Sequence, residues 1–201
     1  MILIALLTST CCTALAAGLS PLELRCEYQN NPLGIDVLQP RLSWIVESGR
    51  RAQRQTAYRI LVASTPEKLA DDEGGLWDTG KVATNQTSGV DYAGKPLGPR
   101  MQCHWKVMVW DRDDAASAWS TPAFWTMGLL DKTDWTAQWI EHDTAAMNED
   151  PELLLPPSPY FRKEFETAKP VRRATVYASA LGLFELRLNG QRVGADYLTP
   201  G

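Results

Sequence analysis

The chain has 201 residues, with 20 lysines and arginines against 24 aspartates and glutamates, so its formal net charge is −4. This acidic balance disfavours nucleic-acid binding, which needs clustered Lys and Arg to neutralise phosphates. A hydrophobic content of 44% with 22% charged residues is typical of a folded globular protein. The 8 tryptophans stand against only 2 histidines, which excludes a metal site made of histidines alone.

The N-terminal segment has the pattern of a secretory signal peptide. Its first 21 residues carry no charged side chain, and a short apolar run is followed by the small-x-small motif Ala14-Leu15-Ala16. The run is too short for a membrane span, which takes about 20 apolar residues. We therefore expect cleavage after Ala16 or Ala17, with residues 1–17 as the signal peptide. The protein is expected to be exported to the periplasm or the extracellular space, without a membrane span.

Removal of that segment leaves two cysteines, Cys26 and Cys103. An oxidising compartment permits a disulfide between them. Each lies in a strand-like run, so each could equally be a buried free thiol that packs as a small apolar residue. We favour free thiols and leave the disulfide open. No spacing of Cys and His resembles a zinc site, and we predict neither a metal nor a cofactor.

From Leu22 onward, apolar and polar residues alternate over short runs that glycine and proline separate. Alternation over four to eight residues predicts strands with one face on a core. The clearest inward-facing sets are Leu22, Leu24, Cys26; Leu42, Trp44, Val46; Tyr58, Ile60, Val62; and Trp105, Val107, Val109. The only helix signal is Ser64-Thr65-Pro66-Glu67, where a capping residue precedes a proline, and Glu follows Ser64 by three positions.

About seven strand-like runs without a long helical period predict a fibronectin type III-like or immunoglobulin-like β-sandwich. We assign this domain to residues 18–128 and expect Trp44, Trp77 and Trp105 in its core, because alternation directs them inward. Trp110 and Trp119 flank a predicted turn. They are the better-exposed candidates for stacking on a sugar ring.

The rest of the chain is predicted to begin a second β-sandwich module, which makes the chain all-β. Residues 129–159 are expected to hold a strand at 135–140 and an acidic, Pro-rich linker. Further strand-like runs lie at residues 160–166, 171–180 and 182–188, and the last ends in Asn189-Gly190, a strong hairpin signal.

The strands predicted in residues 160–201 have apolar faces but too few partners to cover them. We therefore interpret this region as the incomplete start of the second module and the chain as a fragment. The alternative is a complete small domain that pairs its edge with another chain.

Two groups of acidic residues, Asp71-Asp72-Glu73 and Asp111-Asp113-Asp114, lie in predicted turns. Aspartates in turns favour hydrogen bonds to the local backbone, so we interpret both groups as solvated turns rather than catalytic pairs. No glycine-rich phosphate loop and no G-x-S-x-G motif is present in the sequence. We assign no catalytic, cofactor-binding or metal-binding residue.

Several short motifs follow one another along nearly the whole mature chain. They are Asn31-Pro32-Leu33-Gly34, Pro40-Arg41-Leu42-Ser43-Trp44, Leu76-Trp77-Asp78-Thr79-Gly80, Trp105-Lys106-Val107, Leu188-Asn189-Gly190 and Leu198-Thr199-Pro200-Gly201. No single motif is diagnostic, but the ordered set resembles the N-terminal region of bacterial α-L-rhamnosidases.

That resemblance implies a fibronectin-like domain, a β-sandwich module and a separate (α/α)6 catalytic barrel. In such enzymes a carboxylic acid and a carboxylate hydrolyse terminal α-L-rhamnosyl groups with inversion. No segment of this sequence has the helical period of such a barrel, so the family's catalytic residues have no counterpart here.

The function expected is that of a non-catalytic N-terminal portion of an exported α-L-rhamnosidase-like glycoside hydrolase. Its partners would be the missing C-terminal catalytic barrel of the same protein and rhamnose-containing glycans. The alternative is an exported fibronectin-like carbohydrate-binding or adhesion module without catalytic activity. A third interpretation is the remnant of a truncated gene.

Overall fold

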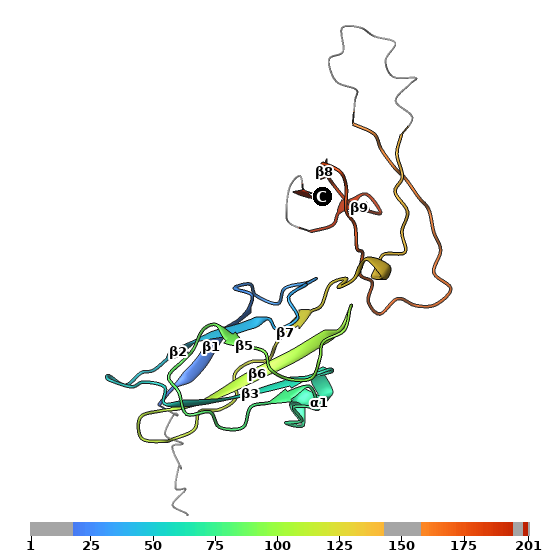
Figure 1. Cartoon of the computed structure of the whole chain (residues 1–201). Coiled ribbons are helices and arrows are strands. Elements are labelled where there is room, and N and C mark those ends of the chain that lie inside the picture. Colours follow the sequence, from blue (N-terminus) through green and yellow to red (C-terminus); the bar gives the residue numbers. More distant parts are fainter. Residues whose placement is uncertain (1–17, 143–157, 195–198, 201) are drawn as a thin grey trace, which may run out of the picture. The chain divides into compact units, whose positions relative to one another are not determined.

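The structure, a computed structural model, describes residues 18–142, 158–194 and 199–200. The chain divides into two compact units, the first ending at Trp139 and the second beginning at Ile140 (Figure 1). The predicted signal peptide and most of the predicted acidic linker lie outside the described residues. Within the described residues, no helix has the length and apolar character needed to cross a membrane.

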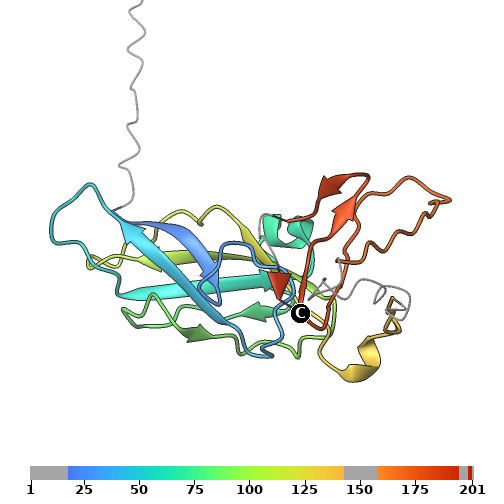
Figure 2. The ribbon, with the colours of Figure 1, turned by 90° about the horizontal axis from the view of Figure 1, so that it is seen from above.

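The first unit is a sandwich of two antiparallel sheets (Figures 1 and 2). One sheet has the order β1-β2-β5, with bounds Ser20–Cys26, Arg41–Glu47 and Val90–Asp91. The other has the order β4-β3-β6-β7, with bounds Trp77–Asp78, Ala57–Ala63, Gln102–Trp110 and Ala123–Thr126. The predicted immunoglobulin-like sandwich is confirmed. Constant-type immunoglobulin domains divide their strands four and three between ABED and CFG, whereas here β4 joins the sheet of β3, β6 and β7.

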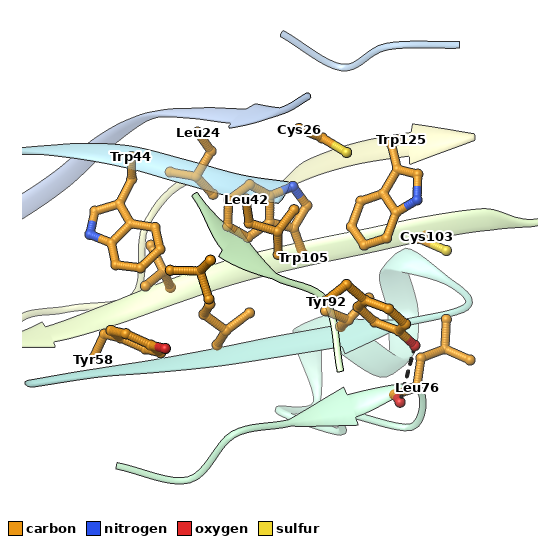
Figure 3. Close-up of a cluster of buried hydrophobic side chains, with 14 of the residues drawn as sticks. Leu24, Cys26, Leu42, Trp44, Tyr58, Leu76, Tyr92, Cys103, Trp105 and Trp125 are labelled. Atoms are coloured by element: carbon orange, nitrogen blue, oxygen red, sulfur yellow. Dashed lines mark hydrogen bonds between the residues drawn. The ribbon is translucent and has the colours of Figure 1, made fainter. Parts of the chain in front are cut away.

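The centre of the core is the ladder between β3 and β6, whose register runs from Ala57 opposite Trp110 to Ala63 opposite His104. Because successive side chains in a strand point to opposite faces, the predicted inward sets of both strands meet the other sheet. All six of their side chains are buried: Tyr58, Ile60, Val62, Trp105, Val107 and Val109. Figure 3 shows this cluster between the two sheets.

Aromatic rings occupy much of the core. Trp44 and Trp105 are buried and Trp77 packs against the core at its edge, as predicted. Tyr92 links two parts of the cluster, because its ring meets Trp77 edge-on at 5.2 Å and Trp125 at 6.0 Å between centroids. Such edge-to-face pairs stabilise beyond the area that they bury. Trp125 is fully buried although the sequence interpretation did not assign it to the core.

Strand β1 departs from the predicted alternation. Leu22 was expected to face inward but is 38% exposed, while Pro21, Leu24 and Cys26 are buried. The register against β2 shifts between Leu22 and Arg25, and Glu23 has a positive φ of 47°. A β-bulge of this kind inserts an extra residue and moves the following side chains to the opposite face.

The predicted short helix is α1, Pro66–Ala70. Its N-cap is Thr65 rather than Ser64, because the Thr65 hydroxyl accepts a hydrogen bond from the backbone N–H of Lys68. Leu69 packs against Leu61 and Ala63 on the outer face of β3 and forms a second, small core. A 3₁₀ helix at Lys132–Asp134 follows the sandwich.

The second unit contains short strands, each of two residues: β8 Leu183–Phe184, β9 Arg187–Leu188, β10 Gln191–Arg192 and β11 Thr199–Pro200. The predicted hairpin is confirmed, because β9 pairs with β10 across Asn189-Gly190. Both turn residues have positive φ, 49° and 79°, as a type I′ turn requires. Strand β8 pairs with β11.

Three predicted strands are absent from the described residues. Residues 135–140, 160–166 and 171–180 were expected to be strands but form none. Apolar alternation favours a strand, but the strand forms only when a neighbour completes its backbone hydrogen bonds. Large apolar side chains stay exposed in the second unit, Tyr160 and Leu181 most of all. That residues 160–201 are an incomplete module remains a prediction.

Candidate functional site

Trp110 and Trp119, the candidates for sugar stacking, lie on the outer face of the four-stranded sheet. The side chains of β6 point alternately to the two faces of the sheet. Lys106, Met108 and Trp110, which lie next to the core-facing residues of this strand, therefore point outward. Trp119 follows β6 and covers the small core formed by α1 on β3. Both indoles are half-buried rather than exposed. The structure therefore places the two on one face of the domain.

Cations lie over the ring of Trp119. The Lys106 Nζ atom is 4.9 Å from the ring centroid, and the Arg59 guanidinium carbon is 5.8 Å from it. Both distances lie within the range of a cation–π interaction. Residue Arg59 comes from β3 and Lys106 from β6, so adjacent strands deliver the two charges to one indole.

Each of these cations also pairs with a carboxylate. Two nitrogens of Arg59 donate to the two carboxylate oxygens of Asp78 at 2.9 and 2.7 Å, which is bidentate geometry. The Lys106 ammonium donates to Asp72, which follows α1. These hydrogen bonds from the cations hold the pKa of Asp78 and of Asp72 below the ordinary aspartate value. The charges on this face are therefore satisfied within the domain.

Trp110 has a similar environment. The Lys81 Nζ atom lies 4.8 Å from its ring centroid, and the same ammonium pairs with Asp114. A sugar ring stacking on either tryptophan would compete with a cation already placed over that indole. This arrangement disfavours Trp110 and Trp119 as open stacking platforms. The more exposed tryptophans are Trp135 and Trp139, which the sequence interpretation had placed in a strand.

The acidic turns match their prediction except at one residue. Asp71, Asp72, Glu73, Asp113 and Asp114 are exposed, as expected for solvated turns. Asp111, the remaining residue of the two acidic groups, is only 1% exposed.

The position of Asp111 follows from the parity of β6. Its Oδ1 atom accepts backbone hydrogen bonds from Asp113 at 2.9 Å and Ala115 at 3.0 Å, so the predicted local turn bonds exist. The interpretation of Asp111 as solvated is wrong, because the inward-facing series Trp105, Val107, Val109 reaches position 111. That period-2 series was the sequence signal that could have shown its burial.

Cys26 and Cys103 are free thiols, both buried. Burial is the main cause that raises the pKa of each thiol to about 12, and Glu27 adds to the effect at Cys26. A thiol with such a pKa is almost fully protonated at neutral pH and is a poor nucleophile and metal ligand. Among the described residues, no three His, Cys, Asp or Glu side chains are grouped to hold a metal ion.

The sandwich, its closed aromatic core and an outer face whose charges pair internally define an immunoglobulin-like β-sandwich domain. Residues 21–131 match the family model described as the Rha78A-like, N-terminal immunoglobulin domain. Residues 169–201 match the family model described as the alpha-L-rhamnosidase N-terminal domain. The chain therefore belongs to this family and corresponds to the N-terminal region of α-L-rhamnosidases.

Curated relatives agree with this assignment. The chain is 35% identical over 187 residues to an alpha-L-rhamnosidase of Formosa agariphila, covering 86% of this chain and 20% of the relative. It is 43% identical over 127 residues to an alpha-L-rhamnosidase of Streptomyces avermitilis, covering 63% of this chain and 12% of the relative. The chain thus spans about a fifth or less of the length of these relatives.

Solved structures show the same correspondence. The Streptomyces avermitilis alpha-L-rhamnosidase complexed with L-rhamnose has a TM-score of 0.59 and 41% identity, covering 63% of this chain and 12% of that one. The alpha-L-rhamnosidase of Aspergillus terreus has a TM-score of 0.62 and 25% identity, covering 91% of this chain and 20% of that one.

Proposed function

We propose that this chain is the non-catalytic N-terminal portion of an exported glycoside hydrolase that acts on terminal α-L-rhamnosyl groups. One observation carries the proposal: the family model of the Rha78A-like N-terminal immunoglobulin domain and that of the alpha-L-rhamnosidase N-terminal domain match in order along the chain. Because the chain covers only 20% of its Formosa agariphila relative, most of that relative's length has no counterpart here.

The cations beside Asp72 and Asp78 support a non-catalytic role for these two carboxylates. Inverting glycosidases need a general acid whose pKa is raised, opposite a general base about 6.5–9.5 Å away. Arg59 and Lys106 act in the other direction, since their hydrogen bonds lower the pKa values of Asp78 and Asp72. Both carboxylates therefore suit structural ion pairs better than proton donation to a leaving group.

The proposed role is architectural. Large apolar side chains of the second unit are exposed, including Phe161, Phe165 and Leu183. Exposed apolar patches of soluble proteins commonly mark interaction surfaces. We assign these side chains to contacts with the rest of the same protein, both the remainder of the second module and the catalytic barrel, which the relatives' greater length would supply.

The test is an assay of the purified full chain on an aryl α-L-rhamnoside, with a complete α-L-rhamnosidase as the positive control. We expect no release of the aryl group. Turnover by this chain would overturn the proposal. The reading frame in the source DNA provides a second test, because we expect it to continue into several hundred residues with helical periods.

A binding assay on the same protein tests the alternative that the chain is a carbohydrate-binding module. We expect that titration with L-rhamnose leaves the tryptophan fluorescence unchanged, since cations lie over Trp110 and Trp119. Saturable binding that Trp119→Ala abolishes and the control Trp139→Ala retains would favour a binding module. A reading frame that ends without related sequence would favour it as well.

A further inference from the structure

Gly18, which precedes β1, lies against the buried carboxylate of Asp111. A Cβ atom added to Gly18 would be 2.5 Å from Asp111 Oδ2 and 3.1 Å from Gln53 Nε2. At the first distance a Cβ atom would fit only if the Asp111 carboxylate moved away. Since the Cβ position and the backbone nitrogen are both bonded to Cα, the Gly18 nitrogen lies within about 5 Å of the same carboxylate oxygen.

Among the described residues, Asp111 has no ion-pair partner. Its Oδ1 atom accepts two backbone N–H groups, and its Oδ2 atom accepts the Gln53 amide at 3.2 Å. The neighbouring acidic residues do have cationic partners. The Asp113 Oδ2 atom lies 3.6 Å from Arg112 Nε and 3.9 Å from Arg50 Nη2, and Asp114 pairs with Lys81. A carboxylate that is buried without a counter-charge is costly to the folded state.

A second polar group nearby has an acceptor atom without a donor. The Oε1 atom of Gln53 is buried and has no hydrogen-bond partner, although the Nε2 atom of the same side chain donates to Asp111. Buried polar atoms without partners are rare in folded proteins, and each calls for an explanation. Beside Gly18, a carboxylate without a cation and an amide oxygen without a donor therefore come together. A small group with a positive charge and several N–H donors would satisfy both.

We propose that hydrolysis of the Ala17–Gly18 peptide bond creates this group, and that the Gly18 α-ammonium pairs with Asp111 and donates to Gln53 Oε1. Water adds across the peptide bond, so the released segment ends in the Ala17 carboxylate and the mature chain begins with the Gly18 ammonium. Before cleavage the same nitrogen is an uncharged amide with a single N–H.

This inference rests on the proposed export and selects one of the two cleavage positions that the sequence allows. Cleavage after Ala16 would put the charge on Ala17, one residue before Gly18 in the chain, whereas cleavage after Ala17 puts the charge on Gly18 itself. Removal of the signal peptide thus completes the polar interactions at the end of β6. It links processing to the stability of the sandwich.

The test uses the full chain exported from a bacterium that processes signal peptides. Mass spectrometry of the secreted protein should find Gly18 at the N-terminus. The reactivity of its α-amine toward a small acylating reagent is then followed against pH. Because the carboxylate favours the charged amine, the midpoint should lie above that of ordinary N-terminal amines, and acylation at neutral pH should be about tenfold slower or more.

Two variants of similar shape separate the ion pair from simple burial. Asp111→Asn should return the midpoint to the ordinary value, whereas Asp113→Asn, two residues away and exposed, should leave it raised. If Asp111→Asn does not fold, a comparison without any substitution still tests the ion pair. The same chain made in the cytosol, with residues 1–17 retained, should melt a few degrees below the processed protein.

The outcomes separate this inference from the proposed function. Retention of residues 1–17 in the secreted protein would overturn the predicted signal-peptide cleavage and the ion pair, but not the proposed function. A mature chain that starts at Ala17 would overturn the ion pair alone. A Gly18 amine with an ordinary midpoint, or one that Asp111→Asn does not change, would do the same.

Discussion

Two of the buried tryptophans differ in the hydrogen bonding of their indoles. The Nε1 atom of Trp44 donates to Gln55 Oε1 at 3.0 Å, and the Gln55 amide donates in turn to the carbonyl oxygen of Gln86 at 2.8 Å. The buried Nε1 atom of Trp125 has no hydrogen-bond partner. Trp44 thus joins the core to the segment before β5, while Trp125 contributes through packing alone.

This difference predicts unequal costs for the same substitution. Trp44→Phe and Trp125→Phe remove the same atoms, but only the first leaves the buried Oε1 atom of Gln55 without a donor. We expect Trp44→Phe to lower the free energy of unfolding by about 1–3 kcal/mol more than Trp125→Phe. Urea denaturation of both variants measures the difference. Equal losses would show that the Trp44 hydrogen bond adds nothing to stability.

Helix α1 depends on its neighbours for stability. A helix of five residues is too short to be stable alone, so its position requires tertiary contacts. Leu69 supplies the apolar contact, and the pair between Asp72 and Lys106 ties the end of the helix to β6. The Lys106 side chain is almost fully buried, whereas that of Asp72 is 58% exposed. The ion pair therefore lies at the boundary of the domain with solvent.

We expect Asp72→Asn to destabilise the domain at neutral pH by about 1 kcal/mol, a modest value because Asp72 is screened by solvent. Lys106 lowers the pKa of Asp72 in the folded state, so the stabilisation is present above the unfolded value of about 3.9 and is lost as pH falls through the folded value. Urea denaturation should show the two proteins converging in acid. The exposed control Asp71→Asn should match the parent protein throughout. A difference that persists in strong acid would contradict this explanation.

The whole molecule combines two units of different internal packing. The first has a continuous core that includes Leu42, Ile60 and Trp105, all fully buried. In the second, the described apolar side chains are mostly exposed, and its strands have two residues each. Burial of apolar surface is the main force for folding, so stability is concentrated in the first unit.

This contrast in packing predicts that backbone amide hydrogens exchange at very different rates in the two units. Backbone amides of β3 and β6 should exchange only on global unfolding, on the order of 10³-fold or more slowly than those of β9 and β10. Mass spectrometry of peptic fragments from the full chain measures both. Comparable protection of the β9–β10 hairpin and the β3–β6 ladder would mean that the second unit is stable by itself.

Local patterns were sufficient for much of the fold. The alternation of Tyr58, Ile60 and Val62 predicts a strand and its buried face, because the period of two is a property of the strand itself. Asn189-Gly190 predicts its hairpin for a similar reason, since both residues accept positive φ. The candidate indoles Trp110 and Trp119 could be identified from their places beside a turn.

Other features depended on residues distant in the sequence. The cations over Trp119 come from two strands, and the Asp111 carboxylate contacts Gln53 and Gly18, which lie far from it in the chain. Predicted strands such as residues 171–180 did not form, because a strand needs a neighbour to complete its hydrogen bonds. Local periodicity is enough to predict the sandwich and the residues of its core. Which polar groups meet depends on the three-dimensional fold, because their pairing is made by contacts between distant segments.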